Sequence, residues 1–339
     1  FWLVWQKKSS SNKCTRLIIF ALFFCVPCCH EIPLGFFFSL LYNSCWVGGV
    51  NTPLIFGLLI WRGTLVSYVF AAVILFVAIF PFIIKPGKWP AFKYTIPEWG
   101  QRYHKECNII FVEGAPFDED LHKLQRHAFC YHPHGVLSWG FVLNAGFRHF
   151  FEPLFGVVAD ALCYAPLWYW FVTRWTKAVR PASKKHMTRY MEKGESFGII
   201  PGGFEEATIS KLGAQRVYLK KRKGFVKYAL KYGYALVPVY TFGESDTYYN
   251  VQGAWRLRLW LNSLQLPGVL PFGAWWCPIM PKQVRLTTVV GKPLQLPQIS
   301  SPSQTDVNKW HEEYVKALLE VFEQNKSQCG YPDAEMELW

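Results

Sequence analysis

The sequence predicts an α/β domain that follows an N-terminal transmembrane helical hairpin, and two features support this prediction. Apolar runs dominate the first 84 residues, whereas from residue 85 onward short apolar segments typical of buried strands alternate with helical patterns. With 339 residues, 51% of them hydrophobic, the chain can form one globular core and membrane segments. We therefore divide it into an N-terminal segment (1–40), a hairpin (41–84) and a single membrane-associated domain (85–339).

The expected hairpin consists of two apolar runs that meet across a short turn. Leu65 to Ile84 contains no charged residue over about 20 positions, which is the length needed to span a hydrocarbon core. Leu41 to Trp61 is less purely apolar and meets the first run across Arg62-Gly63-Thr64. Lysines lie on both flanks of the hairpin, so the positive-inside rule places both flanks and the domain on the cytosolic side.

Residues 1–40 are partly apolar, and their role is left open. The run Leu17 to Cys29 is about 13 residues long, which is short for a span and fits an interfacial or signal-like segment. The cluster Cys25-Val26-Pro27-Cys28-Cys29-His30 resembles a metal-ligand spacing. No second Cys-x-x-Cys pair follows at a zinc-site distance, however, which disfavours a metal there, and palmitoylation is the somewhat better of these two minor alternatives. The sequence begins at Phe1, which leaves open whether the N-terminus is complete.

Composition indicates what the domain contacts. The formal net charge of +13 indicates an anionic partner, which could be nucleic acid, lipid headgroups or a phosphorylated cosubstrate. The 28 Phe and 16 Trp residues, without a recognisable nucleic-acid module, favour membrane lipids as partners and no nucleic acid. Several of the ten cysteines lie within apolar runs, which favours a reducing, cytosol-facing environment.

The pattern of the domain predicts several individual elements, although it does not predict strand order. A helix is expected over Gly224 to Tyr232, ending at Gly233, and a final helix over about Asp306 to Gln324 with Ser303 or Thr305 as its cap. We interpret the final helix as structural packing. The expected strands are Ala128 to Tyr131, Phe197 to Ile200, Ala235 to Phe242 and Arg285 to Val290.

Two histidines follow the first of these strands, in the turn His132-Pro133-His134-Gly135. A hydroxyl group becomes a good nucleophile when a base accepts its proton, and histidine suits that role near neutral pH. Spacing alone leaves three alternatives open: hydrogen-bonded turn histidines, a metal-binding His-x-His pair, or a general base. Cys130, within the strand, is a weaker candidate for a covalent nucleophile, because a thiol in an apolar strand is more often buried and inert.

A second turn, Gly202-Gly203-Phe204-Glu205-Glu206, follows the second strand. In one interpretation the glycines only reverse the chain. In the functional interpretation their amides stabilise an oxyanion, while Glu206, or Glu205 in second place, orients an imidazole. Gly243-Glu244 places a further carboxylate after the third strand, where a plain loop is the alternative.

Between Ala207 and Gly243 lie eight lysines or arginines and no acidic residue. Such a run is a solvated face, a contact with anionic lipid headgroups, or a docking site for the phosphates of coenzyme A. The residues expected at a phosphate or at the membrane surface are Arg216, Lys220, Lys221, Arg222, Lys223 and Lys227.

These motifs resemble those of the type-2 diacylglycerol acyltransferase family, which also contains monoacylglycerol and wax-alcohol acyltransferases. Tyr131-His132-Pro133-His134-Gly135 is similar to the hallmark of the family. Arg222-Lys223-Gly224-Phe225-Val226-Lys227, the segment Leu236 to Glu244 and the segment Thr287 to Pro293 resemble further signature blocks in the same order. The resemblance extends from roughly Leu41 to the C-terminus.

The resemblance implies an endoplasmic reticulum membrane enzyme that can also sit at lipid droplets. It implies acyl-CoA as cosubstrate, no bound cofactor, and an acylglycerol as acceptor. The histidine motif of the family maps onto His132 and His134, and its Gly-Gly-x-x-Glu block maps onto Gly202, Gly203 and Glu206. Phe204 and Glu205 depart from the small residues usual in that block, which leaves the exact acceptor open but not the reaction class.

We therefore expect direct acyl transfer to diacylglycerol, yielding triacylglycerol. One of His132 and His134 takes the hydroxyl proton, Glu206 orients the histidine or the hydroxyl, and amides near Gly202 and Gly203 support the oxyanion. The alternatives are a monoacylglycerol or long-chain-alcohol acyltransferase, a non-catalytic lipid-binding or droplet scaffold, and a zinc hydrolase. Whether the chain forms a homo-oligomer is left open.

Overall fold

The computed structural model describes residues 34–84, 87–89, 93, 98, 100–116, 123–146, 154–264 and 266–339. The run Leu17 to Cys29 and the cysteine cluster that overlaps it lie outside these residues. The described residues from Leu34 to Trp339 form one compact unit of mixed α/β structure, as the sequence predicts.

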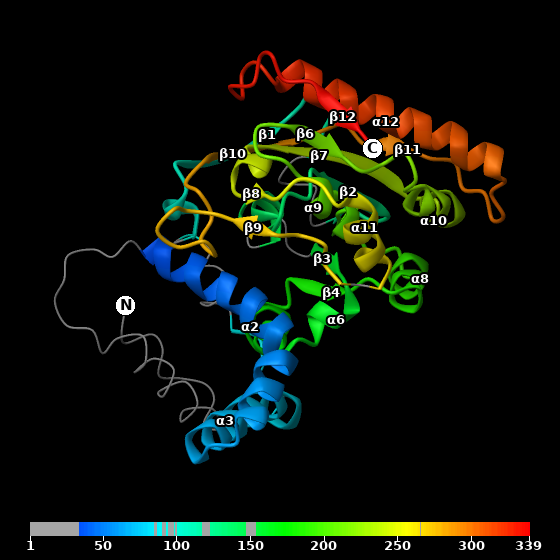
Figure 1. Ribbon diagram of the computed structural model, residues 1–339. Coiled ribbons are helices and arrows are strands. Elements are labelled where there is room, and N and C mark those ends of the chain that lie inside the picture. Colours follow the sequence, from blue (N-terminus) through cyan, green and yellow to red (C-terminus); the bar gives the residue numbers. More distant parts are fainter. Residues whose placement is uncertain are drawn as a thin grey trace, which may run out of the picture. The chain divides into compact units, whose positions relative to one another are not determined.

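The unit is built on an eight-stranded sheet with the order β1-β10-β7-β2-β5-β3-β4, in which β11 pairs with β7 (Figure 1). From β7 to β4 the neighbouring strands are parallel, whereas β10 runs antiparallel to β7 and parallel to β1. The strands of this sheet are β1 (Glu106–Phe111), β2 (His127–His132), β3 (Phe155–Val158), β4 (Val179–Pro181), β5 (Phe197–Ile199), β7 (Ala235–Phe242), β10 (Arg285–Val290) and β11 (Leu294–Gln295).

All four predicted strands are confirmed as β2, β5, β7 and β10, with bounds that differ by no more than one residue. β7 is buried along its whole length, which explains its uninterrupted apolar sequence. Two further two-stranded sheets lie outside the main one; they pair β6 (Gln215–Val217) with β12 (Met336–Leu338) and β8 (Tyr249–Asn250) with β9 (Pro271–Phe272).

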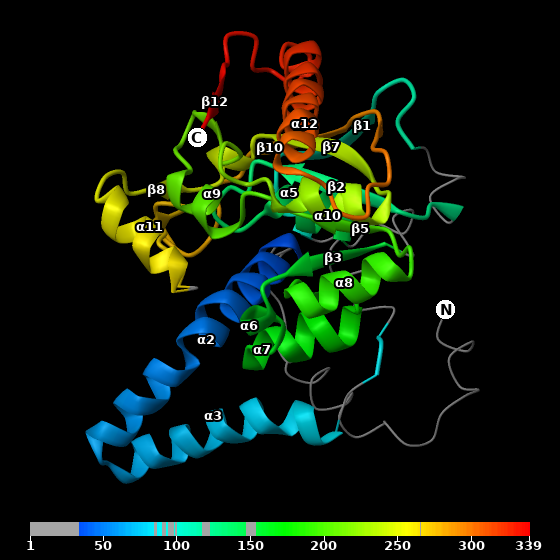
Figure 2. The same ribbon diagram turned by 90° about the vertical axis from the view of Figure 1, so that its right-hand side faces the viewer.

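Helices cover both faces of the sheet, and alternate residues of β7 face the two sides. Leu236 and Tyr240 belong to the core cluster that contains Tyr314 and Phe322 of α12, whereas Val237 belongs to the cluster that contains Phe141. Figure 2 shows α12 on one side of the sheet and α2, α3, α6 and α7 on the other.

The helices are α2 (Leu34–Arg62), α3 (Leu65–Ile84), α5 (Trp139–Phe141), α6 (Asp160–Cys163), α7 (Pro166–Trp168), α8 (Lys184–Glu192), α9 (Gly203–Ile209), α10 (Gly224–Tyr232), α11 (Trp255–Ser263) and α12 (Gln304–Asn325), with π-helical turns at Val142–Gly146 and Tyr169–Thr176 and a 3₁₀ turn at Glu244–Asp246.

The two helices predicted within the domain are confirmed. α10 spans Gly224–Tyr232 and ends at Gly233, which adopts the left-handed conformation with φ of 65°. α12 begins at Gln304, and its cap is Ser303: the Ser303 hydroxyl accepts from the Asp306 amide, and the Asp306 carboxylate accepts from the Ser303 amide. This reciprocal pair is a capping box and sets the start of the helix.

The two N-terminal apolar runs form the consecutive helices α2 and α3, joined at Gly63-Thr64. Among the described helices, only α3 is long and apolar enough to cross a membrane, since the apolar part of α2 is the shorter stretch Thr52–Arg62. The earlier part of α2 packs into the domain, where the Tyr42 ring lies 4.9 Å from that of Trp139. A membrane-spanning hairpin at 41–84 therefore remains a proposal.

The capping box of α12 generates a prediction about stability. We expect Ser303→Ala to lower the free energy of unfolding by about 1 kcal/mol, because the Asp306 amide loses its acceptor. Thermal or chemical unfolding of the purified chain in detergent measures the change. Ser301→Ala, a change outside the capping box, serves as the control, and equal losses from both variants would show that the cap contributes nothing.

Candidate active site

The predicted catalytic residues converge at one edge of the sheet. His132 ends β2, Glu206 lies on α9 directly after β5, and Glu244 directly follows β7. Because β5, β2 and β7 are parallel neighbours, their carboxyl ends lie side by side. The sheet order, which the sequence did not predict, is what brings His132 and Glu206 together, with Glu244 at the same edge of the sheet.

Glu206 is fully buried, and its carboxylate joins three parts of the chain. Its Oε1 accepts the His134 amide at 2.7 Å and lies 3.4 Å from His132 Nδ1, while its Oε2 accepts the Tyr218 amide at 2.8 Å. A Cβ at Gly202 would lie only 2.0 Å from Oε2. Glycine at 202 is therefore required by the carboxylate that the turn encloses.

His132 is held inside the protein by both of its ring nitrogens. Its Nδ1 faces Glu206, and its Nε2 lies 3.1 Å from the Tyr314 hydroxyl of α12. Burial raises the pKa of Tyr314 well above its usual 10, so the phenol keeps its proton and can donate it to Nε2. His132 then donates from Nδ1 to Glu206. Its side chain is fully buried, and it is not among the residues that line the cavity described below.

His134 is placed differently, because it is only partly buried and lines a cavity. Its Nδ1 lies 3.1 Å from the Gly135 carbonyl oxygen, which can only accept, and 3.1 Å from the Ser138 hydroxyl. The Ser138 hydroxyl itself donates to the His134 carbonyl at 3.0 Å. These contacts place the proton on Nδ1 and leave the lone pair on Nε2. Burial lowers the pKa of His134 from its ordinary 6.5, against the opposing effect of the Glu206 charge, so the imidazole is neutral near pH 7.

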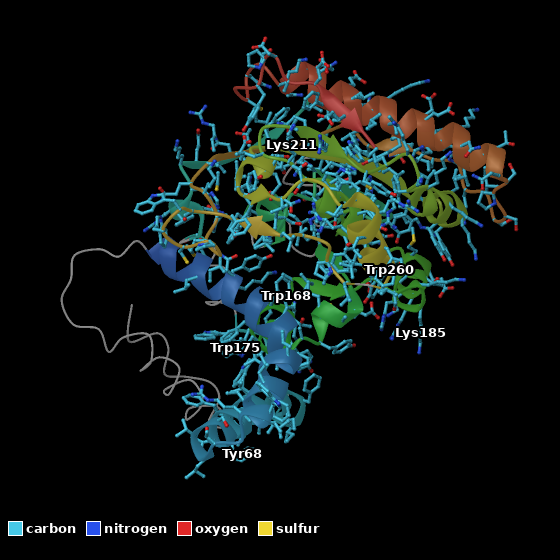
Figure 3. The ribbon with its side chains drawn as sticks, in the orientation of Figure 1. Tyr68, Trp168, Trp175, Lys185, Lys211 and Trp260 are labelled. Atoms are coloured by element: carbon cyan, nitrogen blue, oxygen red, sulfur yellow. The ribbon has the colours of Figure 1, made fainter. Side chains whose placement is uncertain are left out.

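The cavity has a volume of about 440 Å³, and its wall is mostly apolar. Trp168, labelled in Figure 3, lies against α2 with its ring 5.4 Å from that of Tyr42, and both residues line the cavity. A few polar groups lie among the apolar ones, namely His134, Ser138, Glu205, Arg222, Asn262 and Ser263. An apolar cavity with a neutral imidazole in its wall suits a hydrocarbon chain that ends in a reactive polar group.

Glu244 holds the segment that follows the histidines. Its Oε1 accepts the Trp139 amide at 3.0 Å and its Oε2 accepts the Gly140 amide at 2.6 Å, at the start of α5. Burial raises its pKa to about 8, although these two amides favour the charged form. Gly135 has φ of 58°, and a Cβ there would lie 2.5 Å from the Glu244 carboxylate. Glu244 thus supports the turn from outside the cavity, and Gly243 before it adopts the left-handed conformation with φ of 89°.

The sequence predicts that the amides of Gly202 and Gly203 support an oxyanion. The Gly203 amide donates to the Ile200 carbonyl at 3.2 Å, so it is engaged in the turn. Gly203 lines the cavity, whereas Gly202 does not. Oxyanion support from the Gly203 amide would therefore require this turn to change.

The basic residues predicted at a phosphate or membrane surface separate into three groups. Arg216 pairs with Glu337, and Lys223 donates to Asn308 on α12 at 2.8 Å, so both serve the packing of the domain. Arg222 lies in the cavity wall and bonds to Glu205. The exposed members are Lys220, Lys221 and Lys227.

Two neighbouring motif residues have structural roles. Gly224 begins α10, and Phe225 packs edge-on against the Tyr314 ring at 5.0 Å. Phe225 thereby supports the tyrosine that contacts His132.

Covalent and metal-based chemistry find little support at this edge. Cys130 is fully buried, and burial raises its pKa to about 12, so its thiol stays protonated. Among the described residues, no group of three or more His, Cys, Asp and Glu side chains is placed to hold a metal ion. His132 and His134 therefore lack a third protein ligand within that part of the chain.

Sequence reasoning missed Tyr314 and Ser138. Tyr314 lies at helical spacing among apolar residues of α12, so its pattern is that of a core residue. Ser138 is a polar residue four positions after His134, next to buried Trp139, and that spacing is the signal that could have indicated it. It adopts a left-handed conformation with φ of 54°, and its hydroxyl contacts both the ring and the backbone of His134.

Comparisons with known proteins agree on one group of enzymes. A family model described as diacylglycerol acyltransferase matches residues 115–338. The chain is 34% identical over 236 residues to the diacylglycerol O-acyltransferase 2-like protein 6 of Mus musculus, covering 62% of this chain and 69% of that protein. It is 30% identical over 295 residues to the 2-acylglycerol O-acyltransferase 3 of Homo sapiens, covering 77% and 84%.

Two further matches are a third enzyme relative and a solved structure. The diacylglycerol O-acyltransferase 2 of Dictyostelium discoideum is 32% identical over 230 residues, covering 61% of this chain and 68% of that protein. Among solved structures, the 1-acyl-sn-glycerophosphate acyltransferase of Thermotoga maritima covers 86% of this chain and 96% of its own, with a TM-score of 0.41 and 14% identity.

The contacts of Glu206 predict a large effect of a small change. The Glu206 carboxylate accepts hydrogen bonds from two backbone N–H groups, those of His134 and Tyr218. In Glu206→Gln, the side-chain NH₂ group must replace one of the two acceptor oxygens, so one of these backbone N–H groups loses its acceptor. We expect a loss of about 2–4 kcal/mol in the free energy of unfolding. Glu205→Gln, one residue away and partly exposed, should cost less than about 1 kcal/mol. Unfolding of both variants in the same detergent tests this; a Glu206→Gln protein as stable as Glu205→Gln would contradict the bridging role.

Proposed function

Because the chain belongs to the diacylglycerol acyltransferase family, whose model matches residues 115–338, we propose that it esterifies diacylglycerol with acyl-CoA and uses His134 as the general base. The matched relatives are named diacylglycerol, diacylglycerol-like and 2-acylglycerol O-acyltransferases. The chain is accordingly an O-acyltransferase of lipid biosynthesis, and this sets aside the scaffold and hydrolase alternatives. The acceptor and the roles of individual residues are the proposal.

The observation that carries the proposal is the different placement of the two histidines. Both nitrogens of His132 are engaged inside the protein, by Glu206 and by Tyr314. His134 lines the apolar cavity, and its Nδ1 contacts leave Nε2 as the proton acceptor. We assign the base to His134 and treat Glu206, which accepts the His134 amide, and His132, which contacts Glu206, as positioning residues.

The reaction then proceeds by direct transfer. His134 Nε2 accepts the proton of the acceptor hydroxyl as the hydroxyl oxygen attacks the thioester carbonyl, forming the new C–O bond. The C–S bond breaks, and the proton passes from Nε2 to the departing thiolate. The products are triacylglycerol and free coenzyme A. No acyl-enzyme is formed, in keeping with the buried, protonated thiol of Cys130.

The cavity and its rim suit the cosubstrate. The apolar wall fits the acyl chain, and Arg222 lies in the same wall, where its Nε is buried without a partner among the described residues. Exposed Lys220, Lys221 and Lys227 supply further positive charge for the phosphates of acyl-CoA or for lipid headgroups.

One observation favours a second acceptor. The match to the human 2-acylglycerol O-acyltransferase 3 extends over 77% of this chain, more than the 62% matched by the diacylglycerol O-acyltransferase 2-like protein of mouse. Monoacylglycerol is therefore the alternative acceptor, with long-chain alcohol as a further one.

The proposed location is the endoplasmic reticulum membrane or the lipid droplet, with the catalytic domain (85–339) in the cytosol. The surface of α3 supports this, because large apolar side chains such as Val66, Phe70 and Phe76 are exposed along it. A helix that is apolar on its outer surface is stable in a bilayer rather than in water.

The reaction and its centre can be tested together. Microsomes from a host without neutral-lipid synthesis are supplied with labelled oleoyl-CoA and diacylglycerol. The wild type should make triacylglycerol, and His134→Ala at equal expression should be slower by about 10²- to 10⁴-fold, the usual contribution of a general base. His127→Ala, which changes a partly exposed histidine at the other end of β2, is the matched control and should keep its activity.

The same assay with monoacylglycerol and with a long-chain alcohol in place of diacylglycerol identifies the acceptor, whereas the histidine variants identify the base. Faster acylation of monoacylglycerol or of a long-chain alcohol would replace diacylglycerol as acceptor while keeping the mechanism. Full activity of a folded His134→Ala protein would remove His134 as the base. His132→Ala should lose stability as well as activity, because Glu206 and Tyr314 lose their shared partner.

The lowered pKa of His134 predicts the pH profile. The neutral imidazole is the active form, so activity is present above the pKa of His134 and is lost as the pH falls through it. Because burial lowers that pKa, the acidic limb of kcat/KM should lie below 6.5. Initial rates across the pH range measure this, and an acidic limb at or above 6.5 would contradict the assignment.

A further inference from the structure

The segment that contains α11, β9 and the loops around them has its polar and apolar side chains reversed. Arg258 and Asn262 are buried, at 4% and 6% exposed. In contrast, Leu257 (58% exposed), Trp260 (56%) and Trp275 (94%) face outward. In a water-exposed surface segment the opposite arrangement is expected. We call the described residues 249–264 and 266–280 the α11 platform. Its other large exposed apolar side chains are Tyr249, Leu264, Leu266, Leu270, Phe272, Trp276 and Ile279.

Buried polar side chains hold the platform in one conformation. The Arg258 guanidinium donates to the carbonyls of Gly268 and Thr208, at 2.6 and 3.1 Å, and to the Asn250 side chain at 2.9 Å. Asn262 accepts the Gly268 amide at 2.8 Å and donates to the Thr208 hydroxyl at 2.8 Å. The exposed apolar side chains are therefore presented by a fixed backbone, since each of these bonds must be broken before the segment can turn them inward.

These same bonds tie the platform to the catalytic edge. Thr208 lies on α9, the helix that carries Glu206. Asn262 and Ser263, at the end of α11, line the cavity together with His134. The apolar surface of the platform thus borders the cavity in which acyl transfer is proposed.

Charge indicates what covers the platform. No aspartate or glutamate occurs between Asp246 and Asp306, whereas Arg256 is exposed on α11 itself. A second copy packed on this surface would bring two such arginines together without an acidic partner. A lipid surface offers both phosphate groups for the arginine and hydrocarbon for the leucines, and tryptophan is favoured at the boundary between them.

The position of the platform agrees with a membrane. In Figure 1, α11 and β9 lie between the level of α12 and that of α3, and Figure 2 likewise shows α11 between these two levels. Figure 3 labels Trp260 on α11. α3 is the one described helix suited to cross a bilayer, so an anchored chain carries the platform on its membrane side.

We propose that the α11 platform is a second membrane-contact surface, which lies in the interfacial layer and admits the acylglycerol from the bilayer to the cavity beside Asn262 and Ser263. The assignment of an acylglycerol rests on the proposed function, whereas the contact with lipid does not. Trp275 and Leu257 enter the headgroup and upper acyl region, Trp260 lies at the boundary, and Arg256 contacts lipid phosphate.

Lipid photolabelling tests the contact directly. The full chain is reconstituted into phosphatidylcholine vesicles, with and without phosphatidylserine, that contain phosphatidylcholine with a diazirine in its acyl chain. After illumination, mass spectrometry should find lipid adducts in the platform as well as in α3, and none in α12. Adducts in α3 with none in the platform would overturn the proposal, as would cross-links from the platform to a second copy in place of lipid.

A kinetic comparison tests the route of the acceptor. In Leu257→Asp/Trp275→Asp, acylation of long-chain diacylglycerol presented in vesicles should fall by about ten-fold or more, because two apolar groups can no longer enter the lipid. Acylation of short-chain diacylglycerol dispersed in water should stay within about two-fold of the wild type. The matched control is Gln324→Asp on α12, an exposed residue, which should change neither rate.

The outcomes separate this proposal from the proposed function. Equal rates of the platform variant and the wild type on vesicles would overturn the acceptor route. If the wild type acylates no acceptor, the proposed function fails, and the photolabelling of the wild-type chain still decides whether the platform contacts lipid. If the variant does not fold, the same photolabelling decides it.

Discussion

The buried carboxylate of Glu206 is the group on which the rest of the proposed active site depends. A carboxylate without exposure to water is stable only when donors surround it, and here they come from β2, from the turn after β2 and from the segment after β6. The backbone must bring these donors to one point. Gly202 leaves room for the carboxylate, and the pairing of β5 with β2 places α9 beside the histidine turn. The geometry of the proposed active site and the stability of the fold are therefore coupled through one side chain.

The same constraint gives two histidines of one short motif different tasks. His132 lies inside the protein, between the carboxylate and the Tyr314 hydroxyl, whereas the amide of His134 is held and its ring is left at the cavity. Ser138 and the Gly135 carbonyl then select the tautomer of that ring. The proposed base, His134, and the proposed positioning residue, His132, are thus close in sequence but lie in different environments. Only the imidazole in the cavity wall, that of His134, can exchange a proton with a substrate.

Apolar surfaces that are not buried in the protein core recur in the parts of the molecule that we assign to lipid. The cavity is a hydrocarbon-lined space with a single neutral imidazole in its wall, α3 has an apolar surface, and the α11 platform buries an arginine while exposing tryptophan. For an enzyme whose acceptor is insoluble in water, such a surface shortens the path from bilayer to base. The proposed cosubstrate, acyl-CoA, is in contrast charged and soluble, and the exposed lysines near Arg222 provide positive charge for its phosphates.

The sequence by itself determined the α/β class, the four strands, both predicted helices and the two turns that carry the site, because hydrophobic period, caps and glycines act over a few residues. Strand order, and with it the meeting of His132 and Glu206, was decided only by the tertiary structure, because it depends on pairing between distant segments. Tyr314 reaches His132 across 182 positions, and nothing local distinguishes it from a core residue. The α11 platform shows the same limit: Arg258 and Asn262 are buried because they bond to Thr208, which lies about 50 positions earlier in the chain, and this contact between distant segments turns Leu257 and Trp260 outward.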